Sequence, residues 1–324
     1  MWQTPQQCLA LLELLVRSTL KRRSSQSIVF DVLAELPWTR ATGRRDEIAL
    51  VTDRRAELVE LIERVWPQWH EVLAQLTAND LPPTPEGWGK LQDTHRADNL
   101  PLLPSRLNQR TAAALVAPHS KALLTASRRV ALGTTEATHD GLARIRPTRG
   151  LMGRSPRGDL DLEALAYVLG ELPIPERALR DGLVLEGTIR AVLLVENLGT
   201  WRDFPEMEGW LLVHVPGWDT ATVLLLLNCI GPDIPMIHFG DLDPNGVRIY
   251  LHLREKCPRL RWFVPSFWSE CVKPRSLGKP WPADLHMVDV PALLGDLIKS
   301  KSWLEQEPLV VDVRIVRALE ALLQ

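Results

Sequence analysis

Several residue types are scarce in this chain of 324 residues, and each scarcity argues against a class of protein. The four cysteines stand far apart and form no CxxC pair, which argues against a disulfide-rich secreted scaffold and a zinc site of closely spaced ligands. No apolar run approaches the roughly 18 residues of a membrane helix. The basic cluster near residue 22 follows an apolar stretch, whereas a secretory signal places its basic cluster first. We therefore expect a cytoplasmic protein with reduced thiols and no membrane segment.

Lysine is also scarce, with eight lysines against 30 arginines. The first 157 residues hold 22 basic and 16 acidic residues, and the remainder holds 16 basic and 24 acidic residues. The planar fork of arginine matches phosphate oxygens. This asymmetry favours a nucleic-acid-binding first half and a second half that holds cations. The chain also lacks a Walker A motif, so any use of ATP belongs to a partner.

The first segment, residues 1–78, has the pattern of a winged-helix-like α+β module. Apolar spacing predicts helices over 5–23 and 25–36, a hairpin over 37–52, and a further helix that begins after Asp53 and continues to Trp69. Arg40, Arg44 and Arg45 lie on the predicted wing, where they would contact DNA. The alternative is a small α+β domain whose turn is charged only because it is solvated.

The second segment, residues 79–184, is predicted to be a connector followed by a basic helical region. Residues 77–110 are rich in Pro, Asn, Asp and Gly, which predicts irregular structure. Residues 111–143 include a helical stretch, TAAALVAPHSKALLTASRRVAL, which is broken near Pro118. Residues 144–158 are predicted to form a flexible basic loop, and 160–172 a helix. Clustered cations release counterions from a DNA backbone, although a solvated linker is equally compatible. The candidate DNA-binding residues of this loop are Arg144, Arg146, Arg149, Arg154 and Arg157.

The third segment, residues 185–324, predicts an α/β domain with a parallel sheet and flanking helices. AVLLVEN, WLLVHVPG, IPMIHFGD and RLRWFVPS are short apolar runs, separated by segments of helical length and period. Wholly apolar strands that alternate with helices indicate βαβ units buried on both faces. Residues 281–324 are expected to be helical, with one strand at LVVDV (309–313).

Acidic residues follow two of the predicted strands. Glu196 ends the first, Asp241 ends the third, and Asp243 comes two residues later. Because chemistry gathers beyond the carboxyl ends of parallel strands, we expect the three side chains to meet at one edge. Three adjacent carboxylates repel one another unless a cation lies between them, and hard oxygen ligands favour Mg²⁺ or Mn²⁺. The residues expected to support this site are Asn197, Gly217, Gly240 and Gly246, the last two by allowing sharp turns.

Three other interpretations of the motif DLDPNG were weighed. It matches the first half of a calcium loop, but His252 stands where the twelfth-position Glu belongs, and a strand precedes it where that loop follows a helix. A turn that merely caps a helix at Asp243 fits the motif taken alone. A sugar-nucleotide DxD motif shares the metal chemistry, but no matching upstream Glu in a βαβ frame goes with it. Glu196 at the end of a buried strand favours the metal site.

The segments VENLGTW, HFGDLDPNGVRI and WLEQEPL together resemble a known family. The Glu on one strand and the DxD on a later strand are similar to the Toprim fold of topoisomerases, primases and related nucleases. The extended segments resemble more closely the JetD family, the nuclease subunits of Wadjet anti-plasmid systems, related to the A subunits of type IIB topoisomerases. The resemblance is specific over 186–255, suggestive over 303–309 and only architectural in the first half.

This resemblance implies a function. It implies that Glu196, Asp241 and Asp243 bind Mg²⁺ or Mn²⁺ and that the chain cleaves double-stranded DNA. It also implies a homodimer that works beside an SMC-type ATPase complex sensing small circular DNA. Two alternatives stay open: a non-catalytic DNA-binding or assembly subunit, and a type IIB topoisomerase-like subunit.

The topoisomerase alternative requires a tyrosine nucleophile, and the chain has two tyrosines. Tyr250 lies inside the helix predicted after the DxD motif, a poor position from which to reach a phosphate. Tyr167 recurs at helical spacing with Leu160 and Ala164, which predicts a core position. Hydrolysis by a metal-activated water is therefore favoured. His214 and His238 lie on predicted buried strands and are expected to be core histidines, with a supporting role possible for His214.

Overall fold

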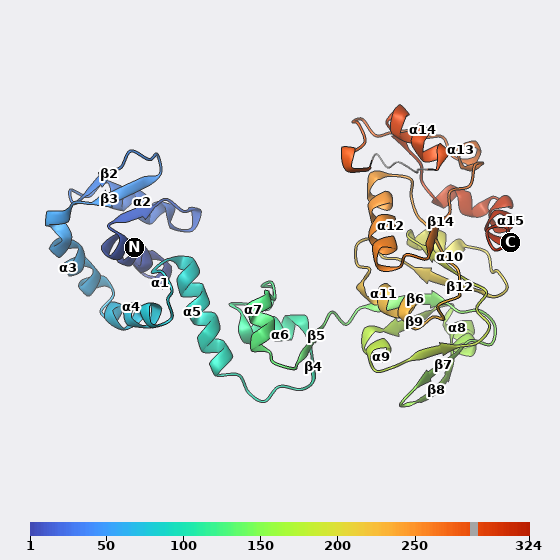
Figure 1. Cartoon of the computed structure of the whole chain (residues 1–324), viewed down its shortest axis with the longest axis horizontal. Coiled ribbons are helices and arrows are strands. Elements are labelled where there is room, and N and C mark those ends of the chain that lie inside the picture. The colour runs from blue at the N-terminus through green and yellow to red at the C-terminus, as the bar shows by residue number, and fades with distance from the viewer. Residues whose placement is uncertain (286–290) are drawn as a thin grey trace. The chain divides into compact units, whose positions relative to one another are not determined.

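The computed structural model describes residues 1–285 and 291–324, which form two compact units, Met1–Ala137 and Thr138–Gln324 (Figure 1). The three segments expected from the sequence, 1–78, 79–184 and 185–324, stay a prediction. Within the described ranges, no helix is both long and apolar enough to cross a membrane. All four cysteines are free thiols.

The N-terminal unit is mainly helical and contains a small antiparallel sheet of order β1-β3-β2. The leucines of α1 are buried against this sheet and the following helices, which together form one hydrophobic core. The predicted hairpin is present, with Thr39 of β2 opposite Leu50 of β3. The elements are α1 (Pro5–Arg17), β1 (Thr19–Lys21), α2 (Ser27–Ala34), β2 (Thr39–Ala41), β3 (Glu47–Leu50), α3 (Arg55–Val65), α4 (Trp69–Ala78), α5 (Pro85–Asp98), β4 (Arg106–Asn108), α6 (Gln109–Val116), α7 (Ala126–Ala131) and β5 (Glu136–Thr138).

Three expectations for this unit were wrong. The helix expected over 5–23 ends at Arg17, because Ser18 adopts a left-handed conformation and Thr19–Lys21 pairs with β3 as strand β1. The single helix from Asp53 to Trp69 is two helices, α3 and α4, because Pro67 cannot continue a helix. Residues 77–110 include the helix α5 where irregular structure was expected. Thr84 accepts a hydrogen bond from the Gly87 N–H, and Pro85 occupies the first helical position, so a strong start signal outweighs the two glycines of this segment.

The C-terminal unit is built on a six-stranded sheet of order β14-β13-β11-β12-β6-β9. The four strands from β14 to β12 are parallel, which confirms the predicted βαβ arrangement, and β6 and β9 add antiparallel pairs. The chain is thus a mixed α/β protein with a parallel-containing sheet. The elements are β6 (Leu142–Arg146), β7 (Met152–Ser155), β8 (Gly158–Asp161), α8 (Leu162–Leu169), β9 (Leu172–Pro175), α9 (Glu176–Arg180), β10 (Val184–Glu186), β11 (Ala191–Val195), α10 (Leu198–Asp203), β12 (Trp210–His214), α11 (Ala221–Asn228), β13 (Met236–Phe239), α12 (Pro244–Lys256), β14 (Leu260–Trp262), α13 (Trp268–Cys271), β15 (Arg275–Ser276), α14 (Ala292–Ser300), β16 (Ser302–Trp303) and α15 (Arg314–Ala321).

The two faces of this sheet pack against different cores. Val192 and Leu194 of β11 contribute to one core, which includes residues of α11 and α12. Leu193 and Val195 contribute to the other, which includes Trp268 of α13 and residues of α15. β11 is therefore apolar at every position, since both of its faces are covered.

Two further expectations were wrong. Residues 144–158 are not a flexible loop: they include the end of β6, all of β7 and the start of β8, and β7 lies between β8 and β10 in a small antiparallel sheet. The segment LVVDV is not a strand, since Glu307–Val311 is a 3₁₀ helix with Pro308 near its start.

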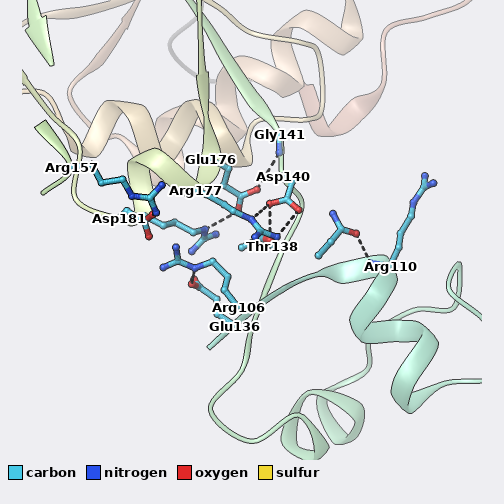
Figure 2. A network of polar contacts seen from close by, with 12 residues as sticks. Arg106, Arg110, Glu136, Thr138, Asp140, Gly141, Arg157, Glu176, Arg177 and Asp181 are labelled. Carbon is cyan, nitrogen blue, oxygen red and sulfur yellow. Dashed lines mark hydrogen bonds and ion pairs between the residues drawn. The ribbon is translucent and has the colours of Figure 1, made fainter. Parts of the chain in front are cut away.

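A network of polar contacts joins α9 to residues 138–141, at the start of the C-terminal unit (Figure 2). Arg177 of α9 donates two hydrogen bonds to Asp140, at 2.6 and 3.1 Å, and Thr138 donates a third at 2.9 Å. The buried Glu176 accepts from the Gly141 N–H at 3.3 Å. These bonds hold α9 to the strand that leads into the sheet.

Candidate metal centre at the carboxyl edge of the sheet

Glu196 directly follows β11, at the carboxyl edge of the parallel strands. Its N–H donates to the carbonyl oxygen of Phe239 at 3.1 Å, so the ladder between β11 and β13 continues to this residue. Because side chains alternate along a strand, Glu196 is on the same face as Leu194, toward α12. One carboxylate oxygen, Oε2, is buried without a hydrogen-bond partner.

Asp241 and Asp243 follow β13, the neighbouring strand, at the same edge. Asp241 Oδ1 accepts from the Gln306 N–H at 2.8 Å. Asp243 is the N-cap of α12, and its Oδ1 accepts from the Gly246 N–H at 2.7 Å. The cap interpretation of DLDPNG is thus realised, and it uses one oxygen of Asp243.

Gly240 and Gly246 allow close approach of neighbouring groups. Neither has a positive φ, so the expected sharp turns are not the reason for glycine here. A Cβ on Gly240 would lie 2.5 Å from Glu196 Oε2, and one on Gly246 would collide with the carbonyl oxygen of Asp241 and lie 3.2 Å from Glu196 Oε2. Gly217 alone of the predicted supporting glycines has a positive φ, 57°, as a sharp turn requires.

The sequence interpretation did not identify Glu307 as part of this site. Leu304 pairs with Leu242 as an isolated bridge and brings the segment 304–307 beside the DxD turn. Glu307 Oε1 accepts from Asn197 Nδ2 at 2.6 Å, and its Oε2 is buried without a partner. The similarity of WLEQEPL to JetD was the signal that could have indicated this acid.

Gln306 and Asn197 hold the two strand ends together. The Gln306 side-chain amide donates to the Phe239 carbonyl oxygen at 3.2 Å, and its oxygen accepts from the Asn197 N–H at 2.9 Å. Asn197 also caps α10 by accepting from the N–H groups of Gly199 and Thr200, at 2.8 and 3.3 Å. The predicted supporting residue Asn197 therefore links the first acidic strand end to Glu307.

Burial and like charge dominate the electrostatics of this edge. Burial, followed by the charges of Asp241, Asp243 and Glu307, raises the pKa of Glu196 to about 8. Burial also raises the pKa of Asp241 to about 7, opposed by the hydrogen bond from Gln306 and assisted by the charge of Glu307. The charges that act on Glu196 are those of Asp241, Asp243 and Glu307, so the structure brings these acids close to one another at the same edge.

These residues fit a divalent cation by their chemistry. Asp241, Asp243 and Glu307 each have one oxygen held by an N–H donor, which orients the carboxylate and leaves its second oxygen for another partner. Two buried carboxylate oxygens, Glu196 Oε2 and Glu307 Oε2, lack any partner, which is costly unless a cation or proton compensates them. Across the described ranges, no three His, Cys, Asp or Glu side chains already stand in a ligand arrangement. The fit of these residues to a divalent cation therefore depends on their oxygen ligands and on the hydrogen bonds that orient the carboxylates.

His214 ends β12 beside Val195, and its side chain lies on the face of the sheet opposite Glu196. Burial lowers the pKa of His214, the charge of Arg144 lowers it further, and a hydrogen bond to the backbone of Glu196 opposes this. The centroid of its ring lies 5.8 Å from that of Trp201. The prediction of a buried histidine is confirmed, and its supporting role stays a prediction.

The predicted wing arginines are exposed in the N-terminal unit. Arg44 and Arg45 lie on the turn between β2 and β3, and Arg40 lies on β2. Arg44 pairs with Glu47 at 3.5 Å, a contact that solvent weakens. These side chains are placed where they can contact a phosphate backbone.

The second arginine group is largely engaged within the C-terminal unit. Arg144 pairs with Glu171 through two bonds, at 2.9 and 2.7 Å. Arg146 donates to the carbonyl oxygens of Trp201, Arg202 and Phe204, and burial lowers its pKa. Both side chains therefore hold the fold together.

The remaining three arginines of this group are exposed. Arg154 pairs with Asp159 and Glu186, and Arg157 pairs with Asp181 at 2.8 Å (Figure 2). Arg149 is 91% exposed, with one weak contact to Glu163 at 4.0 Å. Of the five, Arg149 is the most available to an external anion.

The prediction that Tyr167 is a core residue was wrong. Its side chain is 90% exposed on α8, whereas Tyr250 is buried at 2%. Tyr167 lines a cavity of about 620 Å³ with Arg146, Arg149 and the residues that precede β12. That cavity opens at the amino end of β12, and Glu196 lies at the carboxyl end of β11, parallel to it. The two are therefore at opposite edges of the sheet.

The fold and the acidic edge define an α/β domain with a carboxylate cluster beyond its parallel strands. Residues 157–264 match the family model for the C-terminal part of Wadjet protein JetD. This match, about a third of the chain, includes Glu196, Asp241 and Asp243, and it shows that the chain is JetD-like. No curated protein matches the chain.

Proposed function

We propose that this protein is a metal-dependent endonuclease of double-stranded DNA with a Toprim-type site, acting as the nuclease subunit of a Wadjet-type system. The observation that supports this most directly is the anchored carboxylate cluster inside the JetD-like segment. Glu196, Asp241 and Asp243 lie at the carboxyl edge of parallel strands, where the charges of neighbouring acids act on Glu196 and Asp241. Their donor set suits Mg²⁺ or Mn²⁺.

A bound Mg²⁺ or Mn²⁺ would polarise a phosphoryl oxygen and lower the pKa of a water molecule. The residues of the chain prepare this site. The Gln306 N–H and the Gly246 N–H fix one oxygen each of Asp241 and Asp243, so both carboxylates are oriented before a ligand arrives. Because its pKa is raised to about 8, Glu196 holds a proton near neutral pH in metal-free protein, and binding of a cation would release it.

DNA would be held by arginines outside the acidic edge. Arg40, Arg44 and Arg45 on a winged-helix-like hairpin, and Arg149 beside β6, are exposed. JetD-like membership supports a place in a multi-subunit complex. We propose that the chain works in the cytoplasm as a homodimer beside an SMC-type ATPase complex and acts on small circular DNA.

A type IIB topoisomerase-like function gains one supporting observation, because Tyr167 is exposed and lines a cavity with two arginines. Its place at the opposite edge of the sheet from Glu196 argues against attack within one chain. Hydrolysis therefore remains the proposal. Cleavage by a Tyr167→Phe variant at the wild-type rate, with no covalent protein–DNA adduct, is the expected result.

The direct test is cleavage of a supercoiled plasmid by the full chain with Mn²⁺, with and without the partner subunits. We expect nicking or linearisation, and loss of at least about 100-fold in rate for Asp241→Ala, because charge stabilisation at the phosphoryl group would be lost. Asp233→Asn is the matched control, since Asp233 lies before β13, at the other end of the same strand. Undiminished cleavage by Asp241→Ala would refute the proposal.

A second measurement separates a nuclease from a non-catalytic DNA-binding or assembly subunit. Calorimetric titration with Mn²⁺ should show binding to the wild-type chain and none to Glu196→Gln. Salt-sensitive DNA binding without any metal binding would favour the assembly subunit.

A further inference from the structure

His238 is the most deeply buried ionisable side chain close to the acidic edge. It lies on β13 and is fully buried, and neither ring nitrogen has a hydrogen-bond partner. A buried polar group without a partner costs about 1–3 kcal/mol, and an apolar residue at this position would avoid that cost. Such a group in a well-packed sheet requires an explanation.

The Nε2 atom of His238 faces the same point as the unpartnered oxygen of Glu196. A Cβ built on Gly240 would lie 2.7 Å from His238 Nε2 and 2.5 Å from Glu196 Oε2, so these two atoms are no more than about 5 Å apart. The strand pattern explains the convergence. His238 and Gly240 are two positions apart and share a face, and Val195 pairs with Phe239, which places Glu196 beside Gly240.

Two lone buried polar atoms thus flank the empty position of the Gly240 side chain. The gap is one that a single water molecule, or a small rotation of the carboxylate, would bridge. Because an alanine methyl would fill that position, glycine is the residue that keeps the path between them open.

The ring of His238 is held in place by aromatic packing. It stacks on Tyr250 of α12, with 5.7 Å between the ring centroids and 29° between the ring planes. Tyr250 in turn stacks on Trp262, with 4.4 Å between the centroids and 20° between the planes. The guanidinium carbon of Arg254 also lies over the Tyr250 ring, at 5.9 Å from its centroid. Burial keeps the imidazole neutral, with its pKa lowered to about 3, so one nitrogen carries a hydrogen and can donate.

We propose that His238 is a positioning residue of the metal centre, whose Nε2–H donates to Glu196 Oε2, directly or through one water, and thereby directs the other carboxylate oxygen to the cation. Gly240 serves the same contact by leaving the space free. This inference rests on the proposed metal site. A histidine that only filled the core would not explain why both ring nitrogens are buried without a partner. Loss of such an orienting partner lowers metal affinity about 10–100-fold.

The first test compares two amide variants in the full chain. The Gln side chain in His238→Gln places its amide nitrogen near the position of Nε2, whereas the shorter Asn in His238→Asn reaches only the position of Nδ1. Calorimetric titration with Mn²⁺ should show affinity at least about 10-fold weaker for His238→Asn and within about 3-fold of wild type for His238→Gln. Ile237→Val, on the opposite face of the same strand, is the packing control and should bind as wild type.

A second variant tests the contact from its other side. Gly240→Ala should weaken Mn²⁺ binding to a similar extent as His238→Asn, and the double variant should lose little more, because both remove one interaction. Additive losses would show two unrelated effects and would overturn the proposal.

A third test uses the wild-type chain, so its result does not depend on whether a substituted chain folds. Histidine ¹⁵N chemical shifts should show His238 as the neutral Nε2–H tautomer, and they should differ between the metal-free chain and the chain with diamagnetic Mg²⁺. The Nδ1–H tautomer would overturn the proposal.

The outcomes also separate this inference from the proposed function. If the wild type binds Mn²⁺ and both amide variants bind equally well, or both bind equally poorly, the His238 contact is refuted while the metal site stands. If the wild type binds neither Mn²⁺ nor Mg²⁺, the metal site is refuted and the positioning role falls with it.

Discussion

Two groups of carboxylates in the C-terminal unit are stabilised in opposite ways. Outside the acidic cluster, acids face arginines: Glu171 is bound by Arg144 and Arg202, and Asp181 by Arg157. At the edge, Glu196 and Asp241 face other acids and backbone N–H groups. The first group needs nothing from outside the chain. The second keeps uncompensated charge at a buried position, an arrangement that is typical of functional sites.

The largest expected difference between the two groups is in metal affinity. Asp241→Asn should weaken Mn²⁺ binding at least about 100-fold, because loss of a charged ligand exceeds the 10–100-fold effect of residues that only orient ligands. Glu171→Gln should leave the affinity unchanged, since its charge is already matched by Arg144. Calorimetric titration of both variants with Mn²⁺ checks this. Equal losses of affinity would contradict the claim that only the acidic cluster binds the metal.

The next difference concerns glycines. Gly246→Ala should lower the free energy of unfolding by about 1–3 kcal/mol, because its methyl group would overlap the Asp241 carbonyl oxygen. Gly89→Ala, inside α5 with nothing within 4 Å, should raise it by about 0.5–1 kcal/mol through helix propensity. Urea unfolding of both variants measures the two changes in the free energy of unfolding. A neutral Gly246→Ala would show that the acidic edge is loosely packed.

Charge removal should change stability in opposite directions in the two groups. In metal-free protein, Glu196→Gln should raise the free energy of unfolding by about 1 kcal/mol or more, because it relieves burial of charge among like charges. Glu171→Gln should lower it by about 1 kcal/mol by breaking a partly buried ion pair. Thermal unfolding in the presence of a chelator provides the comparison, and destabilisation by Glu196→Gln would contradict it.

The last expected difference between the two groups is a pH dependence of metal-free stability. The folded pKa of Glu196, about 8, lies above its ordinary value of 4.5, so the folded state binds an extra proton between these values. Stability is then highest below about pH 4.5 for this group and falls as the pH rises toward 8, by about 1.4 kcal/mol per unit of pKa difference at most. Glu171, with its pKa lowered first by the Arg144 hydrogen bond, contributes in the opposite sense, losing stability as the pH falls.

The contribution of Glu196 is measured by comparing the free energy of unfolding of wild type and Glu196→Gln in the presence of a chelator, at pH values from 5 to about 9. The variant should lose less stability across this range. Parallel curves would show that Glu196 is not the group responsible.

The parallel core was predictable because its signals are local and strong. Apolar runs such as AVLLVEN could be only strands buried on both faces, and strand direction then placed Glu196 and Asp241 at one edge. The winged-helix and Toprim assignments stay predictions. The errors fell where composition misled: a strong Thr84-Pro85 start made a helix in a Pro-rich segment, and pairing made strands of the arginine-rich segment before Gly158.

The acidic residues themselves, their order along the chain and their shared sheet edge were determined by the sequence, because side-chain period and strand direction leave few alternatives. Which groups complete that edge was decided only in three dimensions. Gln306 and Glu307 arrive through the single bridge between Leu242 and Leu304, and His238 meets Glu196 only because Gly240 has no side chain. Such contacts join residues distant in the chain through close packing, and no local pattern encodes packing.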